Sequence, residues 1–298
     1  MSFDPRSWLF IPGDSEKKLG KADGAGADAV IIDLEDAVAL ANKDIARDMT
    51  AAFLAERPRD QRKTQFWVRA NAFDTGRTEE DVASVIAAAP DGIVLPKSEG
   101  VGDLEKLSAI LDKLEKKAGI TAGSTRIMPV ATETARAVLK LNEFADAKLS
   151  RLQGLSWGAE DLGTDVGAIG NRLPDGRFYE AFRMVRGLTL FAAHAAGAQA
   201  IDTLMADFRD ENGLKASSEW SYREGFTGRL AIHPAQVEII NQAYLPTDRQ
   251  VEDARAIIAA FEDAPDGAGT VQLEGKMVDR PHLVQAERLV KRWEAFAR

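Results

Sequence analysis

The sequence of 298 residues contains no cysteine and only three histidines. The absence of cysteine excludes disulfides, thiolate nucleophiles, cysteine-ligated zinc and iron–sulfur clusters. It also agrees with a reducing compartment, and we expect a cytoplasmic protein.

Long apolar runs and an excess of basic residues are also missing. The most apolar stretch, residues 188–205, is interrupted by His194, Gln199 and Asp202, so we expect neither a transmembrane helix nor a membrane partner. The first residues carry charges and turn residues too early for a signal peptide. The 38 Lys and Arg are outnumbered by 47 Asp and Glu, which argues against a nucleic-acid-binding surface.

Eight short apolar stretches recur along the chain, each followed by a helical pattern. They are residues 8–11, 29–34, 65–70, 92–95, 126–131, 152–157, 199–204 and 229–232. The repeat of about 32 residues is close to one strand–helix unit. Continuous apolar strands that alternate with amphipathic helices are typical of a parallel sheet covered by helices.

Eight repeats without a large break favour an α/β fold of the closed (β/α)₈ TIM-barrel type. The open doubly wound alternative would need a G-x-G-x-x-G turn after the first strand, and residues 11–14 read IPGD instead. Helical sequence follows the eighth strand to about Asp263, and a Gly/Pro-rich break, APDGAG, comes next. We therefore predict a catalytic barrel over residues 1–264. Residues 265–298 are predicted to form a hairpin and a final helix, as a lid or subunit contact.

Reactive residues of TIM barrels lie at the C-terminal ends of the strands. The polar residues at those positions are Asp33, Glu35, Asp36, Arg69, Asn71, Lys97, Glu133, Glu160, Asp161, Asp202 and His233. Carboxylates that converge on one mouth repel one another unless a cation lies among them. A site of oxygen ligands alone suits Mg²⁺ or Mn²⁺.

Several longer motifs also resemble a known family. The stretches WLFIPGD, IIDLEDAV, WVRAN, GIVLPKS, ATETARAV, GLSWGAEDLGTDVG and GKMVDRPH stand in the same order as in the citrate-lyase-β/malyl-CoA-lyase family, which has the HpcH/HpaI aldolase type of TIM barrel. The resemblance extends from Trp8 to His282. It implies a Mg²⁺-dependent carbon–carbon lyase that cleaves a 3-hydroxy-acyl-CoA, such as malyl-CoA or citramalyl-CoA. The products would be acetyl-CoA and glyoxylate or pyruvate, formed by a retro-Claisen-type reaction.

The resemblance also implies roles for individual residues. Glu133 in ATETAR and Asp161 in GAEDLG match the metal ligands. Arg69 in WVRAN matches the arginine that binds the substrate's oxygen atoms, and backbone N–H groups at Gly158 and Ala159 would hold the substrate carboxylate. From the residues alone, Glu133 is equally well explained as a cap or salt-bridge partner of the helix that starts near Thr134, and Asp161 as the cap of the next helix. For Arg69, a mere ion pair with Asp33 or Glu35 is the less favoured alternative.

Three further acidic residues receive supporting or catalytic roles. Glu35 and Asp36 are expected beside the metal ligands, where they would order metal-bound water. Asp279 in GKMVDRPH matches the aspartate that reaches the active site of a neighbouring subunit, where it is the acid–base group at the carbon alpha to the thioester. That role requires a homo-oligomer, which we expect to be a homotrimer or homohexamer. Read without the resemblance, Asp279 is a solvated turn residue next to Arg280.

Several alternatives remain open at this point. The chain could be a malyl-CoA thioesterase, have malate-synthase-like activity, serve as the β subunit of a citrate lyase acting on an acyl-carrier partner, or be a barrel without catalysis. Lys97 could form an imine, but an ion pair with the carboxylates is favoured. Phe73, Trp157 and Val166 are candidates for the pocket that selects the keto acid.

Overall fold

A computed structural model describes residues 4–265 and 267–296. The chain divides into two compact units, Asp4–Asn241 and a C-terminal unit that begins at Gln242.

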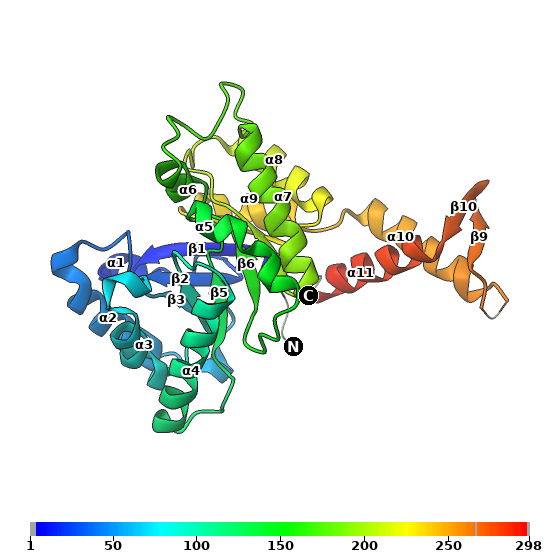
Figure 1. Ribbon diagram of the computed structural model, residues 1–298. Coiled ribbons are helices and arrows are strands. Elements are labelled where there is room, and N and C mark those ends of the chain that lie inside the picture. The colour runs from blue at the N-terminus through cyan, green and yellow to red at the C-terminus, as the bar shows by residue number, and fades with distance from the viewer. Residues whose placement is uncertain (1–3, 266, 297–298) are drawn as a thin grey trace. The chain divides into compact units, whose positions relative to one another are not determined.

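The first unit contains an eight-stranded parallel sheet (Figure 1). Its strands are β1 (Ser7–Pro12), β2 (Ala29–Asp33), β3 (Gln65–Arg69), β4 (Gly92–Leu95), β5 (Arg126–Pro129), β6 (Gly154–Ser156), β7 (Gln199–Asp202) and β8 (Gly228–Ala231). The order β5-β4-β3-β2-β1-β8-β7-β6 leaves β5 and β6 at its two ends. Two parallel bridges, Ile127–Leu152 and Val130–Ser156, join those ends. The predicted (β/α)₈ barrel is therefore confirmed, and each of the eight apolar stretches overlaps one strand.

Helices connect the strands. They are α1 (Glu16–Leu19), α2 (Lys43–Ala55), α3 (Thr78–Val85), α4 (Val101–Ala118), α5 (Ala135–Leu139), α6 (Ala159–Asp165), α7 (Glu180–Ala195), α8 (Glu211–Glu224) and α9 (Ala235–Ala243). Within the described residues, no helix is both long and apolar enough to cross a membrane.

Large side chains fill the interior of the barrel. Buried members of one apolar cluster are Trp8, Ala29, Ile31, Trp67, Val94, Met128, Val130, Ile201 and Leu230. The Trp8 and Trp67 rings meet edge to face with centroids 5.0 Å apart. A Cβ on Gly92 would lie 2.1 Å from the Trp67 ring, so this position has room only for glycine. Because the interior is packed, chemistry is confined to the mouth of the barrel.

The C-terminal unit contains α10 (Asp248–Glu262), β9 (Thr270–Leu273), β10 (Lys276–Asp279) and α11 (Arg280–Phe296). β9 and β10 form an antiparallel hairpin. Its turn places Glu274 and Gly275 at φ values of 50° and 77°, as the twist of a two-residue hairpin loop requires. The hairpin and final helix predicted after residue 264 are thus present, and this unit also includes α10, which packs against α11.

Candidate active site

The last residues of β2 and β3 form the base of a charged cluster. Asp33 and Arg69 are partners in the register of the two strands. Arg69 donates from Nε to Asp33 Oδ1 at 2.7 Å and from Nη2 to Oδ2 at 2.6 Å, a bidentate pair. Arg69 Nη1 lies 2.9 Å from Glu35 Oε2. The ion-pair reading of Arg69 is therefore correct, and the pairing fixes the orientation of the guanidinium.

Hydrogen bonds with Asp33 and Lys43 also fix the loop after β2. Asp33 also accepts hydrogen bonds from the backbone N–H groups of Glu35 and Ala37, at 2.9 and 3.0 Å. Lys43 Nζ donates to the carbonyl oxygens of Leu34 and Glu35, both at 2.7 Å. Glu35 is consequently almost fully buried, whereas the Asp36 side chain is exposed.

Lys97 follows β4 and contacts the carboxylates around it. Its Nζ donates to Glu35 Oε1 at 2.5 Å and lies 3.8 Å from both Asp36 Oδ2 and Asp161 Oδ1. Burial lowers the pKa of Lys97, but the hydrogen bond with Glu35 and the charges of Glu35, Glu133 and Asp36 outweigh burial and raise its pKa above the usual value. The ion-pair prediction is confirmed. A lysine held in its charged form does not supply the neutral amine that imine formation needs.

Glu133 follows β5 and is almost fully buried. Its Oε2 accepts a short hydrogen bond from the backbone N–H of Lys97. Burial raises the pKa of Glu133 to about 8, against an opposing effect of that hydrogen bond and with a contribution from the nearby carboxylates of Asp161 and Glu35. Thr134 caps α5 by accepting from the Ala137 N–H at 3.1 Å. The alternative of Glu133 as the helix cap is therefore wrong.

Asp161 lies in the first turn of α6, which begins at Ala159 after the N-cap residue Gly158. Asp161 is thus not the cap of that helix either, and its side chain is partly exposed beside Lys97. Gly158 donates its N–H to Thr132 Oγ1 at 3.3 Å. A Cβ on Gly158 would lie 2.7 Å from Glu133 Cγ. The missing side chain therefore lets the start of α6 approach Glu133.

The close approach at Gly158 gives a first testable expectation. We expect Gly158→Ala to displace Glu133 and to weaken Mn²⁺ binding by at least about tenfold, as misplaced ligands do. Gly163→Ala is a matched control in the same helix, because its Cβ would have no neighbour nearer than 3.8 Å. Isothermal titration with Mn²⁺ measures both variants. Equal affinities for the two would contradict the steric role of Gly158.

The donor set suits a magnesium ion. Three carboxylates, from Glu35, Asp36 and Asp161, lie within 3.8 Å of the Lys97 ammonium, and Glu133 accepts a hydrogen bond from the backbone N–H of the same lysine. Among the described residues, no three histidine, aspartate or glutamate side chains come together in a way that could hold a metal ion with all three. Mg²⁺ is commonly held by one or two carboxylates and keeps several waters. Glu133 and Asp161 fit this arrangement.

One structural link near the site was not anticipated from the sequence. Asp202, at the end of β7, accepts from Trp157 Nε1 at 2.7 Å and lies 3.1 Å from Arg186 Nη2. Burial opposes ionisation of Asp202, but Arg186 and Arg229 outweigh it and lower its pKa to about 2. Trp157 is fully buried, so the prediction that it lines a substrate pocket is wrong. The bond instead anchors the residue that precedes Gly158.

Asp279 ends β10 in the C-terminal unit. Its Oδ1 forms a short contact with His282 Nδ1, and this hydrogen bond holds the pKa of Asp279 below its usual value. Asp279 is therefore a partly exposed carboxylate at the end of β10 with a histidine partner. The partner was present in the motif GKMVDRPH, at the spacing of one helical turn from Asp279.

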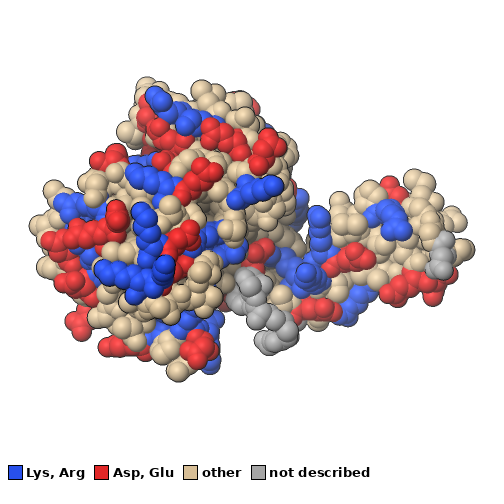
Figure 2. Space-filling view, turned by 60° about the horizontal axis from the view of Figure 1, so that its bottom comes forward, with Lys and Arg blue, Asp and Glu red and all other residues tan. Residues whose placement is uncertain are grey.

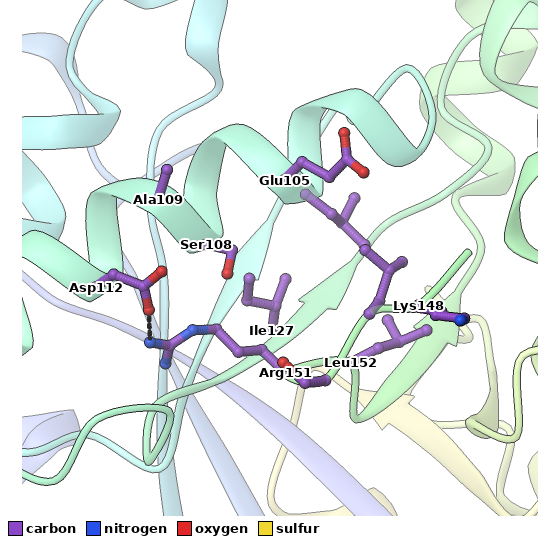
Figure 3. A pocket seen from close by; sticks show the side chains of 11 residues that line it. Glu105, Ser108, Ala109, Asp112, Ile127, Lys148, Arg151 and Leu152 are labelled. Carbon is purple, nitrogen blue, oxygen red and sulfur yellow. Dashed lines mark hydrogen bonds and ion pairs between the residues drawn. The ribbon is translucent and has the colours of Figure 1, made fainter.

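A cavity of about 200 Å³ lies apart from these residues, between α4 and the segment before β6 (Figure 3). Arg151 points across it to Asp112 at 2.5 Å and also pairs with Glu115 at 2.6 Å. Burial opposes ionisation of Glu115, but its bonds with Arg151 and two backbone N–H groups lower its pKa to about 2. The cavity lies at the N-terminal end of β6, a face that serves stability in TIM barrels.

On the surface, acidic and basic side chains are interspersed over the face shown in Figure 2.

Comparison with known proteins is consistent with this geometry. Residues 6–234 match the family described as HpcH/HpaI aldolase/citrate lyase, and residues 176–297 match the family described as a C-C bond lyase of the TIM-barrel fold. Citrate lyase subunit beta of Leuconostoc mesenteroides subsp. cremoris is 35% identical over 96% of this chain and 92% of its own. The (3S)-malyl-CoA thioesterase of Cereibacter sphaeroides is 36% identical over 98% of this chain and 95% of its own.

A solved structure extends the likeness to three dimensions. CitE from Mycobacterium tuberculosis, in complex with magnesium, acetoacetate and coenzyme A, superposes with a TM-score of 0.76 and is 33% identical, with 97% of this chain and 98% of that chain covered. The chain belongs to the HpcH/HpaI aldolase/citrate lyase family.

Proposed function

We propose that this protein is a Mg²⁺-dependent carbon–carbon lyase that cleaves a 3-hydroxy-acyl-CoA of the malyl-CoA or citramalyl-CoA type. The products are acetyl-CoA and glyoxylate or pyruvate. The observation that carries the proposal is the convergence of Glu133, Asp161 and a fixed Arg69 on one carboxylate cluster at the ends of the barrel strands. A relative bound to magnesium and coenzyme A supports it.

Glu133 and Asp161 are the residues that would hold the metal, and their oxygen ligands suit Mn²⁺ as well as Mg²⁺. When bound there, the ion supplies Lewis-acid polarisation of the substrate's hydroxyl and carboxylate oxygens. Glu35 and Asp36 lie beside these ligands through their contacts with Lys97. Their carboxylates are placed to accept hydrogen bonds from water in the cluster.

Arg69 supplies fixed positive charge for the cleavage step. Its Nε and Nη2 are occupied by Asp33, so the guanidinium needs no reorganisation when charge develops on the substrate oxygen. The substrate hydroxyl loses its proton to water in the carboxylate cluster and becomes the keto group. The bond between the hydroxyl-bearing carbon and the carbon alpha to the thioester breaks, and its electron pair forms the acetyl-CoA enolate. The N–H of Ala159, in the first turn of α6, would hold the substrate carboxylate. Gly158 would contribute its N–H only by sharing it with Thr132.

Asp279 is assigned the proton transfer at the carbon alpha to the thioester. In cleavage it protonates the enolate, and in the condensation direction it removes a proton from acetyl-CoA. The lowered pKa favours the basic form, and His282 is the adjacent group that can exchange a proton with it. The assignment places Asp279 of one subunit at the site of its neighbour in a homotrimer or homohexamer.

The direct test is a substrate panel of malyl-CoA, methylmalyl-CoA and citramalyl-CoA. With Mg²⁺ present, we expect keto acid and a shortened acyl-CoA to appear in equal amounts from at least one substrate, and EDTA to abolish the reaction. The acyl-CoA is acetyl-CoA from malyl-CoA or citramalyl-CoA and propionyl-CoA from methylmalyl-CoA. Keto acid is followed with a coupled dehydrogenase and the acyl-CoA by chromatography. No keto acid from any of the three would contradict the lyase proposal.

The same assay separates the alternatives suggested by the relatives. Release of free CoA with malate, and without keto acid, indicates the thioesterase reaction named for the Cereibacter relative. Inactivity on free CoA esters together with cleavage of a citryl thioester on an acyl-carrier protein indicates a citrate lyase β subunit, as in the Leuconostoc relative.

A further inference from the structure

Lys97 joins the carboxylate cluster through two different parts of one residue. Its backbone N–H donates to Glu133, while its ammonium donates to Glu35 and faces Asp36 and Asp161. Residues from four different strand ends, its own included, therefore meet at this one lysine. Within residues 4–265 and 267–296, no other lysine pairs with these carboxylates: Lys43 donates to backbone carbonyl oxygens instead. Arg69 is occupied by Asp33 and Glu35.

The backbone of Lys97 is unusual. Its φ of 49° lies in the left-handed region, which residues other than glycine seldom adopt. Such a conformation persists only where the surrounding structure fixes it, and it occurs most often at functional sites. Here it accompanies the simultaneous contacts to Glu133 and to Glu35. Gly100, three residues later, shows that glycine is used nearby where the chain needs a positive φ, yet position 97 keeps a charged side chain.

We propose that the Lys97 ammonium is a built-in counter-ion that stabilises the carboxylate cluster in the metal-free protein and weakens divalent-cation binding by its own charge. The inference rests on the proposed metal site at Glu133 and Asp161. Like charges a few ångströms apart repel, so a divalent cation beside Asp161 binds against the ammonium. Lys97 therefore makes metal-free protein stable at the expense of metal affinity.

Lys97→Met separates charge from shape, because methionine keeps an unbranched side chain and the backbone N–H. Lys97→Arg keeps the charge. Lys113→Met, on the exposed face of α4, is the control for the loss of one positive charge elsewhere. Mn²⁺ affinity is measured by electron paramagnetic resonance, and the melting temperature is measured in EDTA and in excess Mn²⁺.

We expect Lys97→Met to bind Mn²⁺ at least about tenfold more tightly than wild type and to melt at a lower temperature in EDTA. Excess Mn²⁺ should close the melting gap, and Lys113→Met should behave as wild type. In the extreme case, Lys97→Met folds only with Mn²⁺ while Lys97→Arg folds in EDTA, and this outcome also supports the counter-ion role. If both variants unfold in EDTA, the loss is steric and the counter-ion role is overturned.

Unchanged or weaker Mn²⁺ binding by Lys97→Met, or an unchanged melting temperature in EDTA, also overturns the counter-ion role. A wild-type protein that binds no Mn²⁺, or that binds it as well after Glu133→Gln, overturns the proposed metal site instead. The EDTA measurement needs no metal, so the two failures are distinguishable.

Discussion

Replacing Glu133 by glutamine is expected to lower Mn²⁺ affinity and lyase turnover by on the order of 10³-fold, because one of two proposed ligands loses its charge. The barrel should remain folded. Glutamine has nearly the same shape, and its amide oxygen can still accept the backbone N–H of Lys97. Turnover with malyl-CoA and Mn²⁺ titration measure the two losses.

The same substitution should stabilise the metal-free protein in a pH-dependent way. Burial raises the pKa of Glu133 from its usual value of 4.5 to about 8. The folded state therefore holds a proton that the unfolded state has released between these two pH values, and wild type loses stability as the pH rises through this range. Glutamine does not titrate. The melting temperature of Glu133→Gln in EDTA should thus exceed that of wild type by a margin that grows toward pH 8.

Mg²⁺ provides the control for this comparison. A divalent cation favours the ionised carboxylate, so saturating Mg²⁺ should stabilise wild type and leave Glu133→Gln little changed. If Glu133→Gln loses activity but binds Mn²⁺ with the affinity of wild type, Glu133 is not a metal ligand and acts in turnover in another way. A melting difference independent of pH would contradict the burial argument.

The barrel could be predicted because its signal is repeated and local. Each of the eight apolar stretches overlaps one strand, and the ends of parallel strands necessarily meet at one mouth. That topology alone brings Glu35, Arg69, Lys97 and Glu133 together, although they are far apart in sequence. The division of the helical sequence after β8 into two helices is harder to predict, because the apolar pattern continues from α9 into α10 without a break. In the structure, Pro246 and the capping box of Thr247 and Gln250 separate the two helices.

The orientation of individual side chains could not be predicted. Nothing in the motif GIVLPKS specifies the left-handed backbone of Lys97, because that conformation depends on contacts with Glu133 and Glu35 from other strands. The orientation of Trp157 likewise involves a contact from another strand, because its indole N–H donates to Asp202 on the neighbouring β7. Strand ends thus identify the candidate residues, and tertiary contacts decide which of them can meet a substrate.

Asp279→Asn is expected to abolish cleavage, by at least about 10³-fold in turnover, while Mn²⁺ affinity stays within about twofold of wild type. Asparagine keeps the shape of the side chain and cannot transfer a proton to the enolate carbon. The control is Asp263→Asn, at the C-terminal end of α10, which removes a carboxylate from the same unit. It leaves the pair of Asp279 and His282 intact and should not change turnover. Full activity of Asp279→Asn would contradict its role as the acid–base group.

Mixed oligomers test whether Asp279 serves a neighbouring subunit. Co-expression of Asp279→Asn with Glu133→Gln combines two inactive chains, each of which keeps the residue that the other lacks. If every site takes Glu133 from one subunit and Asp279 from the next, roughly a quarter of the sites in a randomly mixed ring are complete. If both residues come from the same chain, no site is complete. Recovery of activity toward a quarter of the wild-type value, with each variant alone inactive, therefore supports catalysis across the subunit interface, and its absence from verified mixed oligomers places both residues in one chain.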